Sequence, residues 1–126
     1  MGDSYSSGEG IEEFYGQDKD LNDKVQDNDW LAHRSCQSWP SLLKVPGIDG
    51  DMGDYKVSLG ETSSNSCQWY FAAASGAETK HFQNEQKKEY HRWTGPFSAI
   101  EGVKYLPRQL DAFNNIKGDV DYVTLC

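Results

Sequence analysis

An aspartate-rich stretch at 49–54 (DGDMGD) contains the residue types from which calcium sites are built. An EF-hand loop needs oxygen ligands at its first, third and fifth positions, glycine at the sixth and glutamate at the twelfth. Counted from Asp49, the fifth position is Gly53 and the twelfth is Gly60, so the frame fails. The stretch therefore predicts a solvated Gly/Asp turn, with an irregular calcium loop as the alternative.

Histidine and cysteine are common zinc ligands, and His33 and Cys36 have a spacing that would suit one zinc ion. A second close pair is missing, and His81 and His91 lie ten positions apart. Because structural zinc needs four converging ligands, we predict no metal site.

The three cysteines, Cys36, Cys67 and Cys126, form an odd set without a Cys-x-x-Cys spacing. The first residues also lack the basic and apolar regions of a signal peptide. We therefore expect reduced thiols and an intracellular or virion location, without secretion through a signal peptide. A Cys36–Cys67 bridge in an oxidising setting is the alternative.

No sequence motif anchors a catalytic site. The chain has many serines and carboxylates and three histidines, but no Gly-x-Ser-x-Gly elbow, phosphate loop or His-Glu-x-x-His. We predict a non-enzymatic protein with no catalytic residues and no cofactor.

Aromatic residues are numerous for a chain of this size, and most are expected in the core. The alternative is an exposed platform that stacks on sugars or binds a peptide. Its members would be Trp30, Trp39, Trp69, Tyr70, Phe71 and Trp93.

Negative charge is concentrated near the N-terminus. Residues 1–29 hold nine acidic and two basic side chains, which account for −7 of the total −8, and the remainder carries 11 acids and 10 bases. Such a segment cannot bury enough apolar surface to offset its ordering entropy. We therefore predict an extended acidic arm over 1–29, ordered by a partner, followed by a folded domain over 30–126. Its anchors in partner pockets would be Ile11, Phe14, Tyr15, Leu21 and Val25.

The folded domain is predicted to be a small α+β unit, with a short antiparallel sheet and one or two helices. The pattern predicts a helix over 30–38, capped by Asp or Asn before Trp30. Strands are predicted over 55–59, 67–74 and 120–125, and only short elements over 97–113.

The segment 78–93 carries the clearest helix signal. Ser75 and Glu78 have capping-box spacing, and Gly95-Pro96 is a standard stop. A hairpin with strands near 80–84 and 88–93 is the alternative. On a helix, one face would collect the basic residues Lys80, His81, Lys87, Lys88, His91 and Arg92. That basic face is either an ordinary solvated surface or a docking site for an acidic partner, such as the arm of a neighbouring copy.

These features favour a non-enzymatic structural or assembly subunit of a larger complex. The expected partners are proteins, in a homo- or hetero-oligomeric assembly, and the kind of protein that fits best is a small bacteriophage virion protein (decoration, connector or tail component). A pI of about 4.7 disfavours nucleic acid, and no run approaches the ~20 apolar residues of a membrane span. The alternatives are an acidic inhibitor or immunity-type protein that binds a basic groove, and a carbohydrate-binding module.

Overall fold

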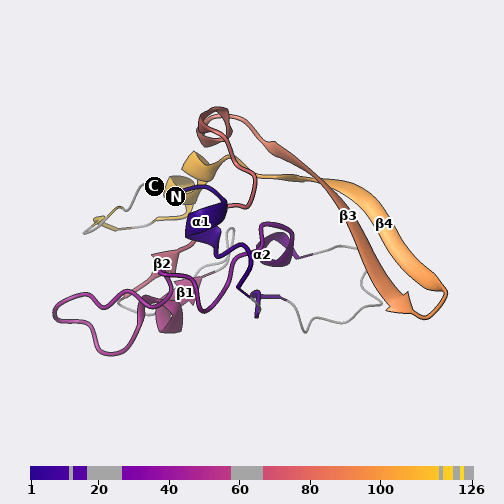
Figure 1. Cartoon of the computed structure of the whole chain (residues 1–126). Helices are drawn as coiled ribbons and strands as arrows, with labels where there is room; N and C mark the ends of the chain where they lie inside the picture. Colours follow the sequence, from indigo (N-terminus) through magenta and orange to yellow (C-terminus); the bar gives the residue numbers. More distant parts are fainter. Residues whose placement is uncertain (12, 17–26, 58–66, 117, 121–122, 124–126) are drawn as a thin grey trace.

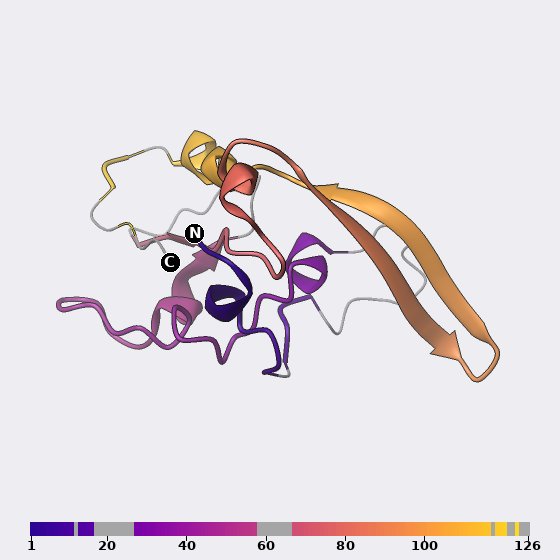
Figure 2. The same cartoon turned by 45° about the horizontal axis from the view of Figure 1, so that its top comes forward.

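The computed structural model describes residues 1–11, 13–16, 27–57, 67–116, 118–120 and 123. Along these residues the elements are α1 Ser4–Ser7, α2 Asn28–Leu31, η1 Met52–Tyr55, β1 Lys56–Val57, β2 Trp69–Tyr70, η2 Thr79–Phe82, β3 Gln86–Gly95, β4 Ser98–Leu106 and η3 Gln109–Asn115, where η denotes a 3-10 helix. Short elements and loops form a body, and the β3–β4 hairpin projects from it (Figures 1 and 2).

The prediction of a small α+β fold with a short antiparallel sheet is confirmed at this coarse level. β3 and β4 form the antiparallel pair, whereas β1 and β2 form a separate parallel pair. Parallel strands need a crossover connection. The sequence pattern did not predict this second pairing, because nothing local to either strand encodes it.

The predicted helix over 30–38 is wrong in its length. Asp27 caps α2 as expected, because its side chain accepts a hydrogen bond from the amide of Asp29. The helix ends at Leu31, because His33 adopts a left-handed conformation with φ 51°. The amides of His33 and Arg34 then donate back to carbonyls of the last turn, which is a Schellman-type ending without glycine.

The predicted helix over 78–93 is also wrong. Only Thr79–Phe82 is helical, as one 3-10 turn, and Gln86–Gly95 is a strand paired along its length with β4. Gly95-Pro96 therefore belongs to a hairpin turn and does not end a helix. The hairpin alternative had the wrong partner strand, because β3 pairs with 98–106 and not with 80–84. Since β4 has nine residues, the expectation of only short elements over 97–113 was wrong as well.

The other predicted strands are only partly present. Of 55–59, the pair Lys56–Val57 is a strand, and 58–59 lie outside the described residues. Of 67–74, only Trp69–Tyr70 is a strand, although 71–74 are buried. The predicted strand over 120–125 lies mostly outside the described residues.

The core is small and largely aliphatic. Its central cluster is Leu31, Ala32, Ala74 and Leu106, with Trp30, Ala77 and Tyr90 packed against it. Phe71 is buried and its ring stacks on that of Trp69, with 4.7 Å between centroids. Because Trp69 itself is only half-buried, the aromatic residues surround this core more than they compose it.

The described part of the predicted acidic arm packs on the body. Gly2 is hydrogen-bonded to Gln109, the amide of Ser35 donates to the carbonyl of Ser7, and α1 lies between these contacts. Asp3 caps α1, and Gly8 ends it with φ 93°. An extended arm is therefore not confirmed for the described residues among 1–16, and 17–26 lie outside the described residues.

Candidate functional site

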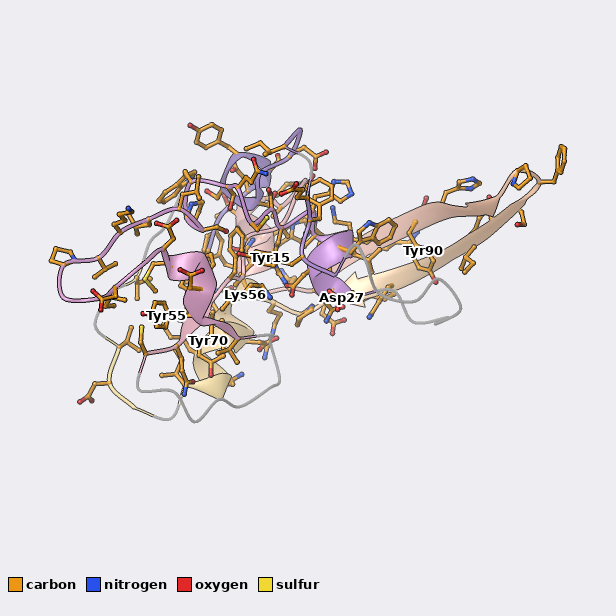
Figure 3. All side chains as sticks on the ribbon, turned by 90° about the horizontal axis from the view of Figure 1, so that it is seen from below. Tyr15, Asp27, Tyr55, Lys56, Tyr70 and Tyr90 are labelled. Carbon is orange, nitrogen blue, oxygen red and sulfur yellow. The ribbon has the colours of Figure 1, made fainter. Side chains whose placement is uncertain are left out.

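The base of the β3–β4 hairpin is fixed to the body by packing and hydrogen bonds. Leu106, the last residue of β4, lies in the core cluster, and Gln86 opposite it donates from Nε2 to the carbonyl of Ser75 at 2.9 Å. The ammonium of Lys88 donates to the same carbonyl. Farther out, Tyr90 lies against Gly102, where a Cβ atom would meet the Tyr90 hydroxyl at 2.5 Å. Tyr90 marks the hairpin side in Figure 3, away from Tyr15 and Lys56 in the body.

Burial along β4 alternates, so the hairpin has a partly covered face and an exposed face. On the exposed face, Val103 lies opposite Glu89 and Tyr105 lies opposite Lys87, and both apolar side chains are more than half exposed. Lys87 and Glu89 pair at 2.7 Å. The exposed face is therefore amphipathic, with apolar groups among paired charges.

The hairpin tip presents an aromatic ring to solvent. Pro96 and Phe97 form the turn between β3 and β4, and Phe97 is 98% exposed. An exposed Phe at the end of a projecting ribbon is costly to hydrate, and the Phe97 ring is buried by none of the residues that the structure describes. The tip is the clearest candidate contact point on the described surface.

The predicted basic face does not exist as one surface. Lys80 lies in η2 and pairs with Glu78 at 3.1 Å, whereas Lys87 and His91 lie on the exposed hairpin face, where His91 pairs with Glu101. By register, Lys88 belongs to the other face of the hairpin, and the side chain of Arg92 lies outside the described part of the structure. The carboxylate of Glu89 raises the pKa of Lys87, while burial lowers the pKa of Lys88.

Two of the predicted arm anchors contact this chain itself. Phe14 stacks on His33, with 4.7 Å between ring centroids and 6° between planes. The Tyr15 hydroxyl donates to Ser41 at 3.3 Å, and its backbone amide donates to Arg34. Ile11 is exposed, and Leu21 and Val25 lie outside the described residues.

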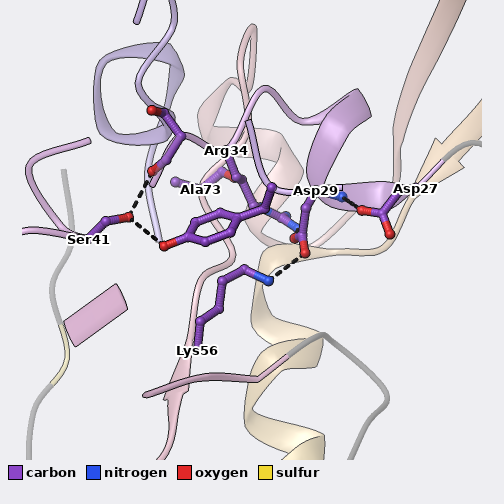
Figure 4. A network of polar contacts seen from close by, with 8 residues as sticks. Asp27, Asp29, Arg34, Ser41, Lys56 and Ala73 are labelled. Carbon is purple, nitrogen blue, oxygen red and sulfur yellow. Dashed lines mark hydrogen bonds and ion pairs between the residues drawn. The ribbon is translucent and has the colours of Figure 1, made fainter. Parts of the chain in front are cut away.

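A buried charge network lies beside the segment that contains Phe14 and Tyr15. The sequence analysis did not predict this network. Asp29, 6% exposed, accepts from Arg34 at 2.7 Å and from Lys56 at 2.5 Å (Figure 4). Arg34 also donates from Nε to the carbonyl of Ala73, and Lys56 lies 4.6 Å from the centre of the Tyr15 ring. Both cations contact the same carboxylate, which compensates part of the cost of burying these charges and fixes the three side chains in place. No local spacing could have indicated the network, because Asp29 and Lys56 are 27 positions apart.

Glu9, His33 and Ser75 form a second polar cluster at the surface. His33 Nδ1 lies 2.6 Å from Glu9 Oε2, and the Ser75 hydroxyl is near enough to Glu9 to help lower the pKa of that carboxyl. Nucleophilic serine sites place the histidine between the serine and the carboxylate. Here the carboxylate is in the middle, so the cluster can tie segments together but cannot activate the Ser75 hydroxyl.

Aspartates of the stretch 49–54, which we considered as calcium ligands, make hydrogen bonds within their own loop. The carbonyl of Asp49 accepts from the Tyr55 hydroxyl at 2.6 Å, and the Asp54 carboxylate caps η1 through the amide of Asp51. Within the described ranges, no group of three or more His, Cys, Asp or Glu could hold a metal ion. Cys36 and Cys67 are free thiols, so the Cys36–Cys67 bridge is not formed, and Cys126 lies outside the described residues.

The loop 39–54 is the second surface with exposed apolar groups. Leu42 is 52% exposed, and Trp39 and Leu43 are exposed as well. Amides of η1 donate to the carbonyls of Ser41 and Leu43, which joins this apolar segment to the aspartate-rich stretch. Trp30 and Trp69 are half-buried, so the described tryptophan side chains include one exposed ring, that of Trp39.

No helix among the described residues is long and apolar enough to cross a membrane. No family model matches the chain, and no curated protein or solved structure is significantly similar to it.

Proposed function

We propose that this chain is a non-enzymatic structural or assembly subunit of a larger complex, and that the β3–β4 hairpin is the arm by which it reaches a neighbouring subunit. A small bacteriophage virion protein, such as a decoration, connector or tail component, is the type of subunit that fits best. The observation that carries the proposal is Phe97, 98% exposed at the end of a ribbon that projects from the body (Figure 2).

Physical arguments support an arm of this kind. A two-stranded ribbon is marginally stable in water by itself, so a contact with another chain would stabilise it. A neighbouring subunit that covered the tip and one face would remove Phe97, Val103 and Tyr105 from water. Their burial would stabilise the contact and the hairpin together.

The test is the size of the native particle. We expect the wild-type chain, tagged and produced in the organism that encodes it, to be part of a particle whose mass by light scattering is far above the monomer mass of 14.2 kDa. Phe97→Ser should shift it toward the monomer without changing its far-UV circular dichroism. Tyr5→Ser is the matched control, because Tyr5 is also a strongly exposed aromatic residue but lies on α1. A wild-type chain that fractionates as a monomer would contradict the proposal.

A further inference from the structure

The N-terminal strap, residues 1–11 and 13–16, is bound to the body without being part of its central core cluster. The members of that cluster lie between Trp30 and Leu106 in the sequence, and none of them belongs to the strap. The two rings of the strap, Phe14 and Tyr15, are half-buried. The strap can therefore leave the body without taking a side chain out of the core cluster. Its buried residues are all small: Gly2, Ser6, Ser7 and Gly8.

The body surface under the strap pairs with the strap through backbone groups. Three body amides, at positions 35, 36 and 74, donate to strap carbonyls at 2.8, 3.2 and 3.2 Å. In return, the amide of Tyr15 donates to the carbonyl of Arg34 at 2.8 Å. A body that has lost its strap offers these groups to any strap of the same sequence, and a second copy of the chain supplies one.

Side chains make the same contact specific. Gln109 binds both backbone groups of Gly2, at 2.9 and 2.7 Å. His33 lies 2.6 Å from Glu9, and its ring is stacked on the ring of Phe14. Each of these contacts joins the strap to a residue of the body, so a strap from another copy would make all of them in the same way.

The connection between strap and body is ten residues long, 17–26, and the residues at its two ends lie beside each other. A Cβ atom on Gly16 would lie 2.6 Å from the carboxylate of Asp27. Docking within one chain therefore closes a loop, which costs entropy. Fully extended, ten residues span at most about 35 Å, close to the diameter of a small domain. The strap of one copy can thus reach the body of an adjacent copy.

We propose that the N-terminal strap of one copy docks on the body of a second copy, in the place that the strap of the single chain occupies. This inference concerns a surface other than the hairpin and does not depend on the proposed function. Reciprocal exchange between two copies gives a closed dimer, and exchange that continues from copy to copy gives a chain. A short connection holds a strap near its own body at an effective concentration of about 1 mM. Exchange should therefore equal docking within one chain at about that concentration of copies.

Cys36 provides a covalent reporter of the contact. Its Sγ lies 3.4 Å from the carbonyl oxygen of Glu13 and 3.7 Å from a carboxylate oxygen of the same residue. Glu13→Cys therefore places a second thiol beside Cys36. The double variant Glu13→Cys/Cys36→Ser keeps the strap thiol and loses the body thiol. When it is mixed with an excess of wild-type chain, a disulfide between positions 13 and 36 can form only across two copies.

The mixture is oxidised briefly with copper–phenanthroline, and the crosslinked peptides are identified by mass spectrometry. We expect about one variant strap in a hundred to be crosslinked between copies at about 10 μM wild-type chain, and about half at about 1 mM. Tyr5→Cys/Cys36→Ser is the matched control for random collisions, because Tyr5 lies on α1 and is 76% exposed. Glu13→Cys alone, at about 10 μM, should form its disulfide with Cys36 within one chain. Far-UV circular dichroism checks that each variant is folded.

Two results would overturn the inference. One is a 13–36 crosslink between copies that stays at the level of the Tyr5→Cys/Cys36→Ser control at about 1 mM chain. The other is a Glu13→Cys chain that forms no disulfide with its own Cys36, since the strap would then not dock at this place on the body. Neither result bears on the hairpin, whose role is tested separately by Phe97→Ser.

Discussion

Gln109 holds the backbone of Gly2 through both ends of its side-chain amide. The Gly2 amide donates to Oε1 at 2.9 Å, and Nε2 donates to the Gly2 carbonyl at 2.7 Å. The two residues are 107 positions apart, and Gln109 is buried. This pair connects the first residues of the chain to η3 and replaces the solvation that both backbone groups lose.

Gln109→Ala should lower the free energy of unfolding by about 1–3 kcal/mol, because it leaves the buried Gly2 amide without its acceptor and the Gly2 carbonyl with only the amide of Ala74 as donor. Gln109→Glu should cost more, since it buries a carboxylate and places one of its oxygens against the Gly2 carbonyl oxygen. Urea unfolding would measure both variants. Gln83→Ala, at an exposed position, is the control. Equal stabilities for Gln109→Ala and the control would contradict the pairing.

Asp29 and Lys56 should respond very differently to substitution. Asp29→Asn leaves Arg34 and Lys56 buried without their carboxylate, which should cost about 3–5 kcal/mol of unfolding free energy. Lys56→Met leaves one carboxylate with one guanidinium, so it should cost clearly less. Chemical denaturation measures the ranking. A Lys56→Met variant as unstable as Asp29→Asn would show that both cations are needed.

Gly102 should not tolerate a side chain. In Gly102→Ala, the new Cβ would lie 2.5 Å from the Tyr90 hydroxyl, so the Tyr90 ring must leave its place against the core. Overpacking of this kind typically costs about 1–3 kcal/mol. Hydrogen exchange of the β3 and β4 amides should then become faster. Gly118→Ala is the matched control, because its Cβ would meet nothing within 4 Å.

Glu9 should contribute a pH-dependent part of the stability. Burial alone raises the pKa of Glu9, but hydrogen bonds from Ser75 and His33 and the charges of His33 and Lys88 outweigh it, so the pKa is lowered from 4.5. A lowered folded-state pKa means that the stabilisation is present above the unfolded-state value and is lost as pH falls through the folded one. The stability difference between wild type and Glu9→Gln should therefore shrink below about pH 4.5.

Urea unfolding at several pH values between about 6 and 3 would follow this difference. Glu85→Gln, at an exposed carboxylate, corrects for the general effect of losing one negative charge. A difference between wild type and Glu9→Gln that stays constant down to pH 3 would refute the assignment of the contacts to ionised Glu9.

Local signals in the sequence predicted local structure well. Asp27 caps a helix, as its residue type indicates, and Gly95-Pro96 does end a regular element, although that element is β3 and not the predicted helix. The same kind of signal was present near the N-terminus, where Asp3 caps the start of α1 and Gly8 ends it. The sequence analysis did not use this signal. Caps and turns are predictable because their free energy arises within a few neighbouring residues.

The hairpin shows where local reasoning stopped. The periodicity of 78–93 favoured a helix, and residues 86–93 alone did not reveal the partner strand that begins at Ser98. Strand propensity depends on cross-strand neighbours and burial, so the register with β4 decides the outcome. The basic face disappeared with the helix, because a strand sends alternate side chains to opposite sides.

The sequence by itself determined the charge balance, the capping and turn positions and the lack of a recognisable catalytic motif. Only the tertiary structure decided that the N-terminal residues pack on the body, that Asp29 receives two buried cations, and that Phe97 stands at the end of a ribbon. The first two features are contacts between segments far apart along the chain. The position of Phe97 depends on the pairing of β3 with β4. Their free energies depend on which surfaces meet when the chain folds, and no spacing within one segment encodes that meeting.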